Sequence, residues 1–430
     1  MDLNNLHPFE KFRKNYQDFR EYNFNIKMAM LSGIFIFIGR GITLGSVFSV
    51  FINVLTGSNR DLGFISTFGG ILMTISLFPA GYLTDRIPRK HMLRLGIILN
   101  LIGFIFLIIA PEILWLYIAQ AFLGFSRGLM QPSQESLIAD SVESNKREKI
   151  YSQIYFLRQA SNASGPALAV FLFFILGDYW GLDVLRQVMV VGAFFTFLGA
   201  IFLFKMDDRH SLGDESESIN ATRVSDQENL ERKLGDQWWF IPASLIALGF
   251  IVGFGAGMTV RFFPVFLKDI YFMPPTVVNG IFAIVFLLTG FVGLSTPKLA
   301  QYFGKMETMF LVQFIATLCL IGIAFVPTLA IMVPLFILRG PLMNSSQPIQ
   351  RSILMDYVPK SSRGKWNALQ VLSFGFLWSI SAGIGGVLLE SFDYSVLYFF
   401  TSFLYIIGTV PLLFLRKFLP KESKKVPEQI

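Results

Sequence analysis

The sequence predicts an all-α membrane protein with twelve transmembrane helices in two six-helix repeats. Three observations support this fold class: an apolar composition, twelve apolar segments of membrane-spanning length, and an internal repeat. Of the 430 residues, 53% are hydrophobic and only 15% are charged, whereas soluble domains carry about 25% charged residues. A chain with a mean hydropathy of +0.57 cannot cover its apolar surface in water, so a membrane is its expected environment.

Each expected span follows from the thickness of a bilayer. A transmembrane helix needs roughly 20 mainly apolar residues, and membrane helices tolerate the glycine and proline found inside many of these segments. The predicted spans are residues 27–53, 62–84, 91–110, 112–141, 150–177, 185–206, 238–267, 275–297, 304–326, 328–357, 364–391 and 394–416.

These spans divide the chain into two bundles with polar connections. Residues 27–206 form the predicted N-terminal six-helix bundle and residues 238–416 the C-terminal one. Between them, residues 207–237 are rich in acidic residues, Ser and Asn and lack an apolar period, which is typical of a disordered linker. Residues 1–26 and 417–430 are polar tails.

The distribution of positive charge predicts the orientation in the membrane. Lys and Arg concentrate in the tails, the linker and alternate loops, and only Arg60, Arg186 and Lys268 fall on the other side. Because cytoplasmic loops carry the excess of Lys and Arg, both tails and the linker are predicted to be cytoplasmic. The net charge of +7 then reflects membrane anchoring, and no nucleic-acid partner is expected. We expect a monomer in the cell membrane, surrounded by lipid.

The two halves repeat at a constant offset of 216 residues. The matching positions are Gln131, Pro132, Gln134 and Ser136 with Gln347, Pro348, Gln350 and Ser352, Asp140 with Asp356, and Gly41 and Thr43 with Gly257 and Thr259. A single offset that links separate regions indicates duplication of a six-span unit. It predicts parallel repeats related by an axis along the membrane normal.

The loop after the second span carries a motif with the sequence GYLTDRIPRK. Gly81 would let helices approach closely, and Asp85 can face the positive N-terminus of a neighbouring helix. Arg86, Arg89 and Lys90 complete the motif as basic residues at its end.

This loop resembles the signature loop between spans 2 and 3 of the major facilitator superfamily, in which a glycine is followed by Asp-Arg, a second glycine and two basic residues. Pro88 stands where the second glycine is usual. Together with twelve spans and two six-span repeats, the resemblance covers the whole chain. It implies the superfamily fold and a transport cycle of alternating access.

The resemblance also implies a cytoplasmic gate. Asp85 would face the start of span 11, Asp140 is the acidic partner expected for Arg86 and Arg89, and Arg147 is assigned to the same gate. In the second half Gln301 replaces the aspartate, which predicts an asymmetric gate. In span 5, Gly165 and Pro166 resemble the Gly-Pro bend of superfamily exchangers and predict a helix kink.

Four arginines lie within predicted spans 1, 4, 7 and 10: Arg40, Arg127, Arg261 and Arg339. A charge at mid-bilayer costs about 2.5–3.5 kcal/mol on insertion scales, so such residues are retained for a function. In the superfamily these four spans line the central cavity, so the resemblance places the arginines around the substrate path. We expect Arg40, Arg127 and Arg339 to form the substrate cluster, and Arg261, nearer the outer face, to act as an outer gate residue. A fifth, Arg158 in span 5, is considered as an inner-gate charge.

Other polar residues within the spans complete the candidate site. Gln131 and Gln347 offer neutral hydrogen bonds to a substrate, and Glu135 is the one carboxylate clearly inside a span, hence the candidate proton carrier. A cavity with more arginine than carboxylate attracts anions, because guanidinium forks fit carboxylate and phosphate groups with two parallel hydrogen bonds.

The leading functional hypothesis is therefore a secondary active transporter that moves a small anionic or polar organic solute by alternating access. Its expected partners are that solute and, if transport is coupled, a proton. A drug–proton antiporter is the alternative, and a membrane sensor without flux is a further one. No HExxH, paired CxxC, GxSxG or P-loop pattern occurs, so neither an enzyme, a metal site nor a cofactor is expected.

Overall fold

The structure is a computed structural model that describes residues 19–84, 86–142, 147–212, 239–358 and 363–416. For a few residues at the edges of these ranges and within the eleventh span only the backbone is described. Most of the predicted tails and linker, and Asp85, lie outside the described residues.

Every expected span is helical. The N-terminal half consists of α2 (Phe24–Thr43), α3 (Ser46–Thr56), α4 (Asn59–Thr84), α5 (Arg89–Ile109), α6 (Ile113–Asp140), α7 (Arg147–Leu176) and α8 (Leu182–Phe204). The C-terminal half consists of α10 (Phe240–Thr259), the short 3-10 turn η5 (Val260–Phe262), α11 (Phe263–Tyr271), α12 (Pro275–Phe303), α13 (Lys305–Ala324), α14 (Leu329–Ser345), α15 (Gln347–Tyr357), α16 (Arg363–Ser391), α17 (Tyr394–Thr409) and α18 (Pro411–Leu415).

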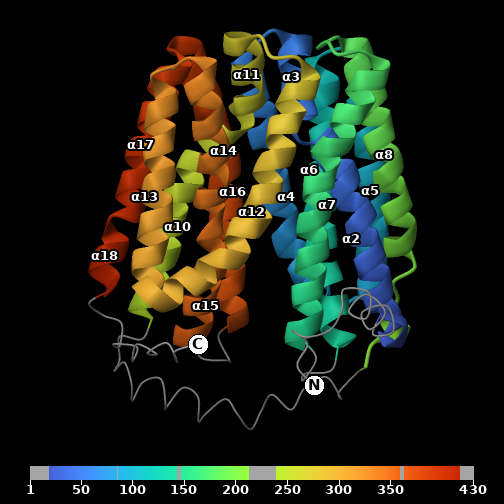
Figure 1. Cartoon of the computed structure of the whole chain (residues 1–430). Coiled ribbons are helices and arrows are strands. Elements are labelled where there is room, and N and C mark those ends of the chain that lie inside the picture. Colours follow the sequence, from blue (N-terminus) through green and yellow to red (C-terminus); the bar gives the residue numbers. More distant parts are fainter. Residues whose placement is uncertain (1–18, 85, 143–146, 213–238, 359–362, 417–430) are drawn as a thin grey trace, which may run out of the picture.

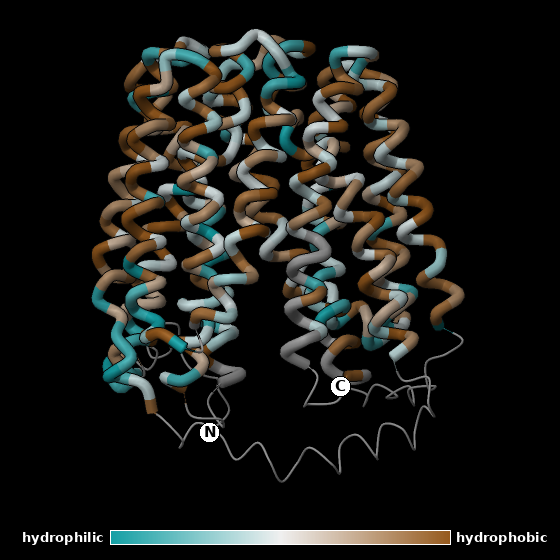
Figure 2. Tube along the Cα trace, turned by 180° about the vertical axis from the view of Figure 1, so that it is seen from behind, coloured by the Kyte–Doolittle hydropathy of each residue, from teal (hydrophilic) through white to brown (hydrophobic). Residues whose placement is uncertain are grey.

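Eleven helical segments of the described residues are long and apolar enough to cross a membrane. The twelfth span is α16, whose described apolar part covers Gly375–Ser391. Hydrophobic residues cover most of the length of the helices, and hydrophilic ones gather at one end of the N-terminal half (Figure 2). The predicted all-α membrane fold is confirmed.

The first span of each half is broken at the same point of the repeat. The sequence predicted continuous helices, but α2 ends at Thr43 and α10 at Thr259, two positions related by the 216-residue offset. Gly45 begins α3 with non-helical backbone angles, and η5 takes up the break in the second half. The tenth span is also broken, at Ser346, whereas its counterpart α6 continues through Pro132.

The two halves meet at the end of the bundle where α3 and α11 lie, which we call the outer end (Figure 1). There α3 packs against α11, α4 against α16 and α7 against α12. Towards the opposite, inner end, where α2 and α10 begin, α7 and α12 diverge (Figure 1). The central space is therefore closed at the outer end.

Neutral hydrogen bonds join the halves near the outer end. The Ser46 hydroxyl donates to Asn279 Oδ1 at 2.6 Å, and the Thr67 hydroxyl donates to the carbonyl of Ser379 at 2.7 Å. The Trp180 indole donates to the carbonyl of Met273 at 2.8 Å. Bonds to carboxylates add to them: the Thr276 N–H and hydroxyl donate to Asp178 at 2.9 and 2.6 Å, and the Ser58 hydroxyl donates to Glu390. A neutral bond contributes about 0.5–1.5 kcal/mol and a bond to a charged group about 1.5–3 kcal/mol.

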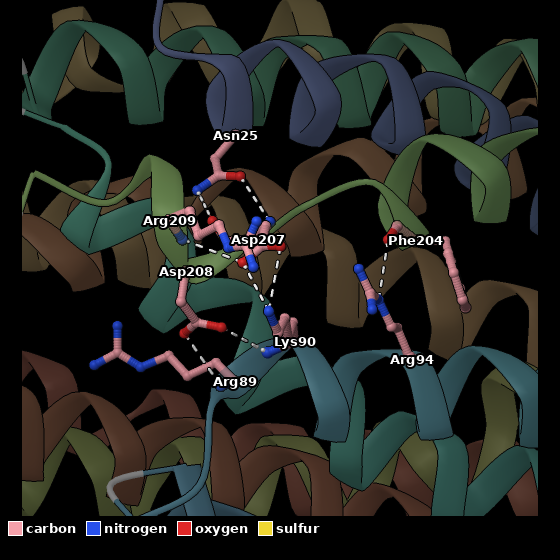
Figure 3. Close-up of polar contacts among 8 residues, drawn as sticks. All are labelled: Asn25, Arg89, Lys90, Arg94, Phe204, Asp207, Asp208 and Arg209. Carbon is pink, nitrogen blue, oxygen red and sulfur yellow. Dashed lines mark hydrogen bonds and ion pairs between the residues drawn. The ribbon is translucent and has the colours of Figure 1, made fainter.

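The predicted linker begins later than the sequence suggested. Residues 207–212, which include the 3-10 turn η2 (Asp208–His210), pack on the inner end of the N-terminal half. Asn25 Nδ2 donates to the carbonyl of Asp207 at 2.9 Å, and the Asp207 N–H returns a bond to Asn25 Oδ1 at 3.1 Å (Figure 3). The Leu212 N–H donates to the carbonyl of Asp140 at 2.8 Å. This polar segment is ordered because it pairs with backbone and side-chain groups at the ends of two spans.

Asp208 caps a helix to which it does not belong. Its carboxylate accepts from the backbone N–H groups of Arg89 at 3.1 Å and Lys90 at 3.2 Å, the first two residues of α5 (Figure 3). The residue preceding α5 is Pro88, which has no oxygen in its side chain to cap the helix itself. The free N–H groups of a helix N-terminus therefore find their acceptor in a distant segment.

Asp207 carries an ion pair beside this cap. Lys90 Nζ lies 3.2 Å from Asp207 Oδ1. Burial disfavours the charged carboxylate, but the Arg209 N–H and the Lys90 ammonium outweigh it and hold the pKa of Asp207 below its usual value. A lowered pKa in the folded state means that this contribution to stability is complete above an ordinary pKa of about 3.9 and is lost as the pH falls through the lowered value.

We predict that Asp208→Ala lowers the free energy of unfolding by about 1 kcal/mol, because loss of a helix cap costs about 0.5–2 kcal/mol. Thermal unfolding of the purified protein in detergent measures the change. Glu112→Ala is the matched control, because Glu112 precedes α6 at the cap position but makes no side-chain capping bond. Equal destabilisation by the two substitutions would contradict the capping role.

Candidate functional site

Two adjoining cavities lie within the bundle. The first, here called the arginine cavity, has a volume of about 330 Å³ and is lined mainly by helices of the N-terminal half. The second, the apolar cavity, has a volume of about 440 Å³ and is lined mainly by α10, α12, α14 and α16. Met73 of α4 and Gln131 of α6 line both cavities, so the two spaces meet there.

Three helices bring arginines to the first cavity. Arg40 of α2, Arg127 of α6 and Arg158 of α7 line its wall. Arg40 and Arg158 both approach one ring, with their Cζ atoms 5.7 and 5.8 Å from the centroid of Phe37. Arg261 belongs to the C-terminal half, but its positive charge acts on both Arg40 and Arg127. Arg261 lines neither cavity, and we group it with the other three by the action of its charge; the four residues are here called the arginine cluster.

Close packing of α2 on α7 places two members of this cluster together. A Cβ atom added at Gly165 would lie 2.5 Å from the Cα of Gly41, so these two glycines allow direct backbone contact. Arg40 immediately precedes one of these glycines, and Arg158 lies two turns before the other. Gly165 and Pro166, where the sequence predicted a kink, lie within one continuous helix, α7. The role that the structure shows for Gly165 is close helix contact.

The cluster contains more positive charge than the surrounding protein neutralises. Glu135 Oε1 pairs with Arg158 Nη1 at 3.2 Å. Among the described residues, no hydrogen bond or ion pair reaches the guanidinium groups of Arg40, Arg127 and Arg261, and Arg261 Nε is fully buried without a partner. Buried charges are normally paired, because their desolvation is costly. Three unpaired guanidinium groups therefore form a site suited to an anion.

Arg339 lies apart from this cluster. It lines the apolar cavity, where its Cζ stands 4.7 Å from the ring centroid of Phe263 and its Nη2 donates to the Tyr405 hydroxyl at 3.2 Å. From the sequence we expected Arg339 in the substrate cluster, but it lines the apolar cavity. Arg261, expected at an outer gate, lies in the turn η5 after Thr259 and lines neither cavity, so its gate role stays a prediction.

The two glutamines predicted to contact a substrate also separate. Gln131 lines both cavities, at their junction. Gln347, its counterpart in the repeat, lines only the apolar cavity, where its Nε2 donates to Asn344 Oδ1 at 3.4 Å.

The predicted gate residues lie at the inner end of the N-terminal half. Arg89 forms an ion pair with Asp140, as the sequence suggested, and its Nη1 also donates to the carbonyl of Ser136 at 3.3 Å. Arg86 instead stacks on Tyr82, with its Cζ 4.2 Å from the ring centroid.

The other residues assigned to the gate contact different neighbours or lie outside the described residues. Lys90 pairs with Asp207, a residue that sequence reasoning left in the linker. The acidic pair Asp207-Asp208 directly after a span was the available signal, since aspartate favours helix caps. Gly81 lies in the last turn of α4. Asp85, the side chain of Arg147 and the segment before Arg363 lie outside the described residues, so the contact expected between Asp85 and span 11 is untested.

The family of the chain follows from its sequence profile. The profile of the Major Facilitator Superfamily matches residues 29–344, well over half of the chain. The chain belongs to the major facilitator superfamily. It is therefore a multi-pass membrane protein and a secondary transporter, not an enzyme. No curated protein sequence matches it.

Solved structures agree with this fold. A bacterial homologue of the iron transporter ferroportin, in an inward-facing state, superposes with a TM-score of 0.70 at 15% identity over 90% of this chain and 98% of that one. A D-xylose–proton symporter gives 0.69 at 16% identity over 93% and 98%. A bacterial homologue of the human lysosomal transporter Spinster, inward-facing and unoccupied, gives 0.71 at 14% identity over 92% and 96%. At these identities the likeness extends to the fold alone.

We predict that Arg339 serves stability more than anion binding. Arg339→Gln removes both the contact with Phe263 and the hydrogen bond to Tyr405, and should cost about 1–3 kcal/mol in unfolding free energy. Tyr405→Phe removes only the hydroxyl and should cost less. Thermal unfolding in detergent measures both, with Arg20→Gln, at an exposed arginine whose side chain makes no described contact, as the control. A melting temperature of Arg339→Gln equal to that of the wild type would reject this role.

Proposed function

We propose that the protein transports a small organic anion by alternating access and binds it in the arginine cluster. The observation that carries this proposal is the set of three guanidinium groups without a carboxylate partner: Arg40, Arg127 and Arg261. Two of them belong to the N-terminal half and one to the C-terminal half. An anion bound among them would therefore contact both halves of the transporter at once.

This arrangement suggests how the substrate drives the cycle. Like charges on the two halves repel each other when the site is empty, and the repulsion opposes closure around it. A bound anion replaces this repulsion with charge-assisted hydrogen bonds to both halves. The occupied site would then close more readily than the empty one, which favours exchange of one anion for another.

Glu135 offers a route for proton coupling. Its carboxylate neutralises Arg158 at the wall of the same cavity. Protonation of Glu135 would end this pairing and add a fourth cation to the anion site. By reciprocal linkage, proton binding would then strengthen anion binding and anion binding would strengthen proton binding. Such coupling corresponds to symport of the anion with a proton.

Drug–proton antiport is the second candidate, and the size and lining of the apolar cavity favour it. A cationic drug would, however, be repelled by the arginine cluster at the junction of the two cavities. We therefore place an anion ahead of a cation. Measured flux in proteoliposomes separates either transporter from a sensor without flux.

The charge distribution supports an orientation with both termini in the cytoplasm, and we propose the plasma membrane as the location. The inner end then faces the cytoplasm, and the structure represents an inward-facing state. In this orientation Arg89–Asp140 and Lys90–Asp207 hold the cytoplasmic end of the N-terminal half together. We assign these pairs, together with Gly81, Asp85, Arg86 and Arg147, to the cytoplasmic gate.

We predict that single Arg→Gln changes at Arg40, Arg127 and Arg261 each weaken anion binding about tenfold or more. Loss of one hydrogen bond to a charged group costs about 1.5–3 kcal/mol, and 1.4 kcal/mol corresponds to a factor of ten. Arg→Lys should restore little of this loss, because an ammonium cannot form two parallel bonds. A thermal-shift screen of carboxylates and phosphates identifies a ligand. Its dissociation constant and its flux are then measured for each variant.

Arg94→Gln is the control for these measurements, since it removes the same charge at a helix end outside both cavities. A screen that returns only cations would reject the proposal. Full retention of binding in all three cluster variants would also reject it.

We predict that Glu135→Gln abolishes uptake driven by a proton gradient but preserves exchange of the anion. The neutral amide can neither take up a proton nor neutralise Arg158, so the site stays permanently in its proton-loaded charge state. Counterflow and pH-driven uptake in proteoliposomes separate the two activities, with Glu112→Gln as a control on an exposed carboxylate. Accumulation by the variant under a proton gradient would show that the proton moves elsewhere.

A further inference from the structure

The two cavities differ in chemistry although they are continuous. The arginine cavity has three arginines, one glutamate and several amides on its wall. The apolar cavity is lined mostly by aliphatic and aromatic side chains, among them Phe263, Phe282, Val285, Phe286, Phe336 and Trp378. Its polar lining residues include Gln313, Asn344, Gln347, Gln350 and Arg351. It extends from Val260, near the outer end, to Leu412 in α18, at the inner end.

The apolar wall is not merely the packed interior of the C-terminal half. Phe286 lines the cavity and is 41% exposed. A Cβ atom added at Gly249 of α10 would meet only Gln350 Nε2, at 3.3 Å, so the cavity is open at this point. The wall therefore has room for an apolar group other than its own side chains.

Two arginines, Arg339 and Arg351, line this cavity, and the buried one does not extend the cationic site into it. Arg339 is held against the ring of Phe263 and by the Tyr405 hydroxyl, and it is only 6% exposed. Arg351, in α15 at the inner end, is exposed. Buried positive charge free to meet a ligand thus lies on one side of Met73 and Gln131, and most of the apolar surface on the other. Met73 has a flexible side chain that adapts to the shape of a neighbour, and Gln131 can bond to a polar linking group.

From this juxtaposition we infer that the substrate is an amphipathic anion. Its oxyanion head binds the arginine cluster, and an apolar body the size of one or two rings occupies the apolar cavity. The inference rests on the proposed function for the binding of the oxyanion head, and it adds the apolar body of the substrate. A compact inorganic anion would leave the apolar wall in contact with water, and burial of that wall is favourable. A neutral apolar molecule would leave the arginines unpaired.

The test compares anions that share a head and differ in their body. Calorimetry measures the affinities of the full-length protein in nanodiscs for inorganic phosphate, phenyl phosphate and 2-naphthyl phosphate. Titrations into empty nanodiscs correct for partition into lipid. Acetate and 2-naphthoate form a parallel series that distinguishes a phosphate from a carboxylate head. We expect affinity to rise at least about tenfold from the smallest to the largest member of either series.

Two variants test whether the added affinity comes from the apolar cavity. Gly249→Leu fills it and Phe286→Ala removes part of its wall, while neither residue contacts the arginine cluster. Each should weaken binding of the naphthyl compound about tenfold and change that of the corresponding small anion less than about twofold. Phe291→Ala is the matched control, because Phe291 lies on the same helix, is 61% exposed and lines neither cavity.

The outcomes separate this inference from the function on which it rests. Equal affinities within each series, with no effect of Gly249→Leu and Phe286→Ala, would overturn the apolar body and leave the anion transporter intact. Binding of 2-naphthol or of 2-naphthylmethylammonium in place of all the anions would overturn both. Loss of binding of the naphthyl compound in the two cavity variants and also in Arg261→Gln supports the apolar body and the anion transporter together.

Discussion

The buried positive charge of the arginine cluster is the constraint on which the rest of the site depends. Two other arginines show how this protein neutralises a guanidinium that it does not leave for a ligand. Arg158 is paired with Glu135, and Arg339 is held by Phe263 and Tyr405. No carboxylate or hydrogen-bond acceptor of the described residues reaches the guanidinium groups of Arg40, Arg127 and Arg261, and Arg40 contacts only the ring of Phe37. These three arginines therefore lack the anionic or hydrogen-bonding partner that Arg158 and Arg339 each have.

The helix breaks explain why this charge is shared between the two halves. Thr43 and Thr259 end their α-helices at matched positions of the repeat, where the first half has a turn at Leu44 and Gly45 and the second half has the 3-10 turn Val260–Phe262. In the second half that turn contains Arg261, and its charge reaches Arg40 and Arg127. In the first half the turn leads into α3, whose Ser46 bonds to Asn279 of the other half. One duplicated feature therefore supplies both a charge for the site and a contact for the outer closure.

The sequence was sufficient for the spans, the repeat and the contact of Arg89 with Asp140, because hydrophobic length and helix ends are local properties. It was insufficient for Arg261 and Arg339. Position along a span gives the depth of a side chain, but not its direction around the helix axis or the effect of a break such as that after Thr259. The docking of Asp207 and Asp208 was missed for a similar reason. Composition alone suggests a solvated linker, whereas the free N–H groups of α5 become its partners only in the folded bundle.

The free energies of these hydrogen bonds indicate why a substrate could move this transporter between conformations. The bonds described between the halves near the outer end include neutral ones, such as Thr67 to Ser379, which contribute about 0.5–1.5 kcal/mol each. They also include bonds to carboxylates, such as Thr276 to Asp178, which contribute about 1.5–3 kcal/mol each. A few of them add up to a few kcal/mol, which is the usual difference between two populated conformations. An anion that pairs with guanidinium groups of both halves gains about 1.5–3 kcal/mol for each charged hydrogen bond. Where those bonds are complete only when the site is closed, the free energy they contribute to the closed site is as large as that of the outer contacts. Substrate binding can then replace closure at the outer end with closure around the substrate.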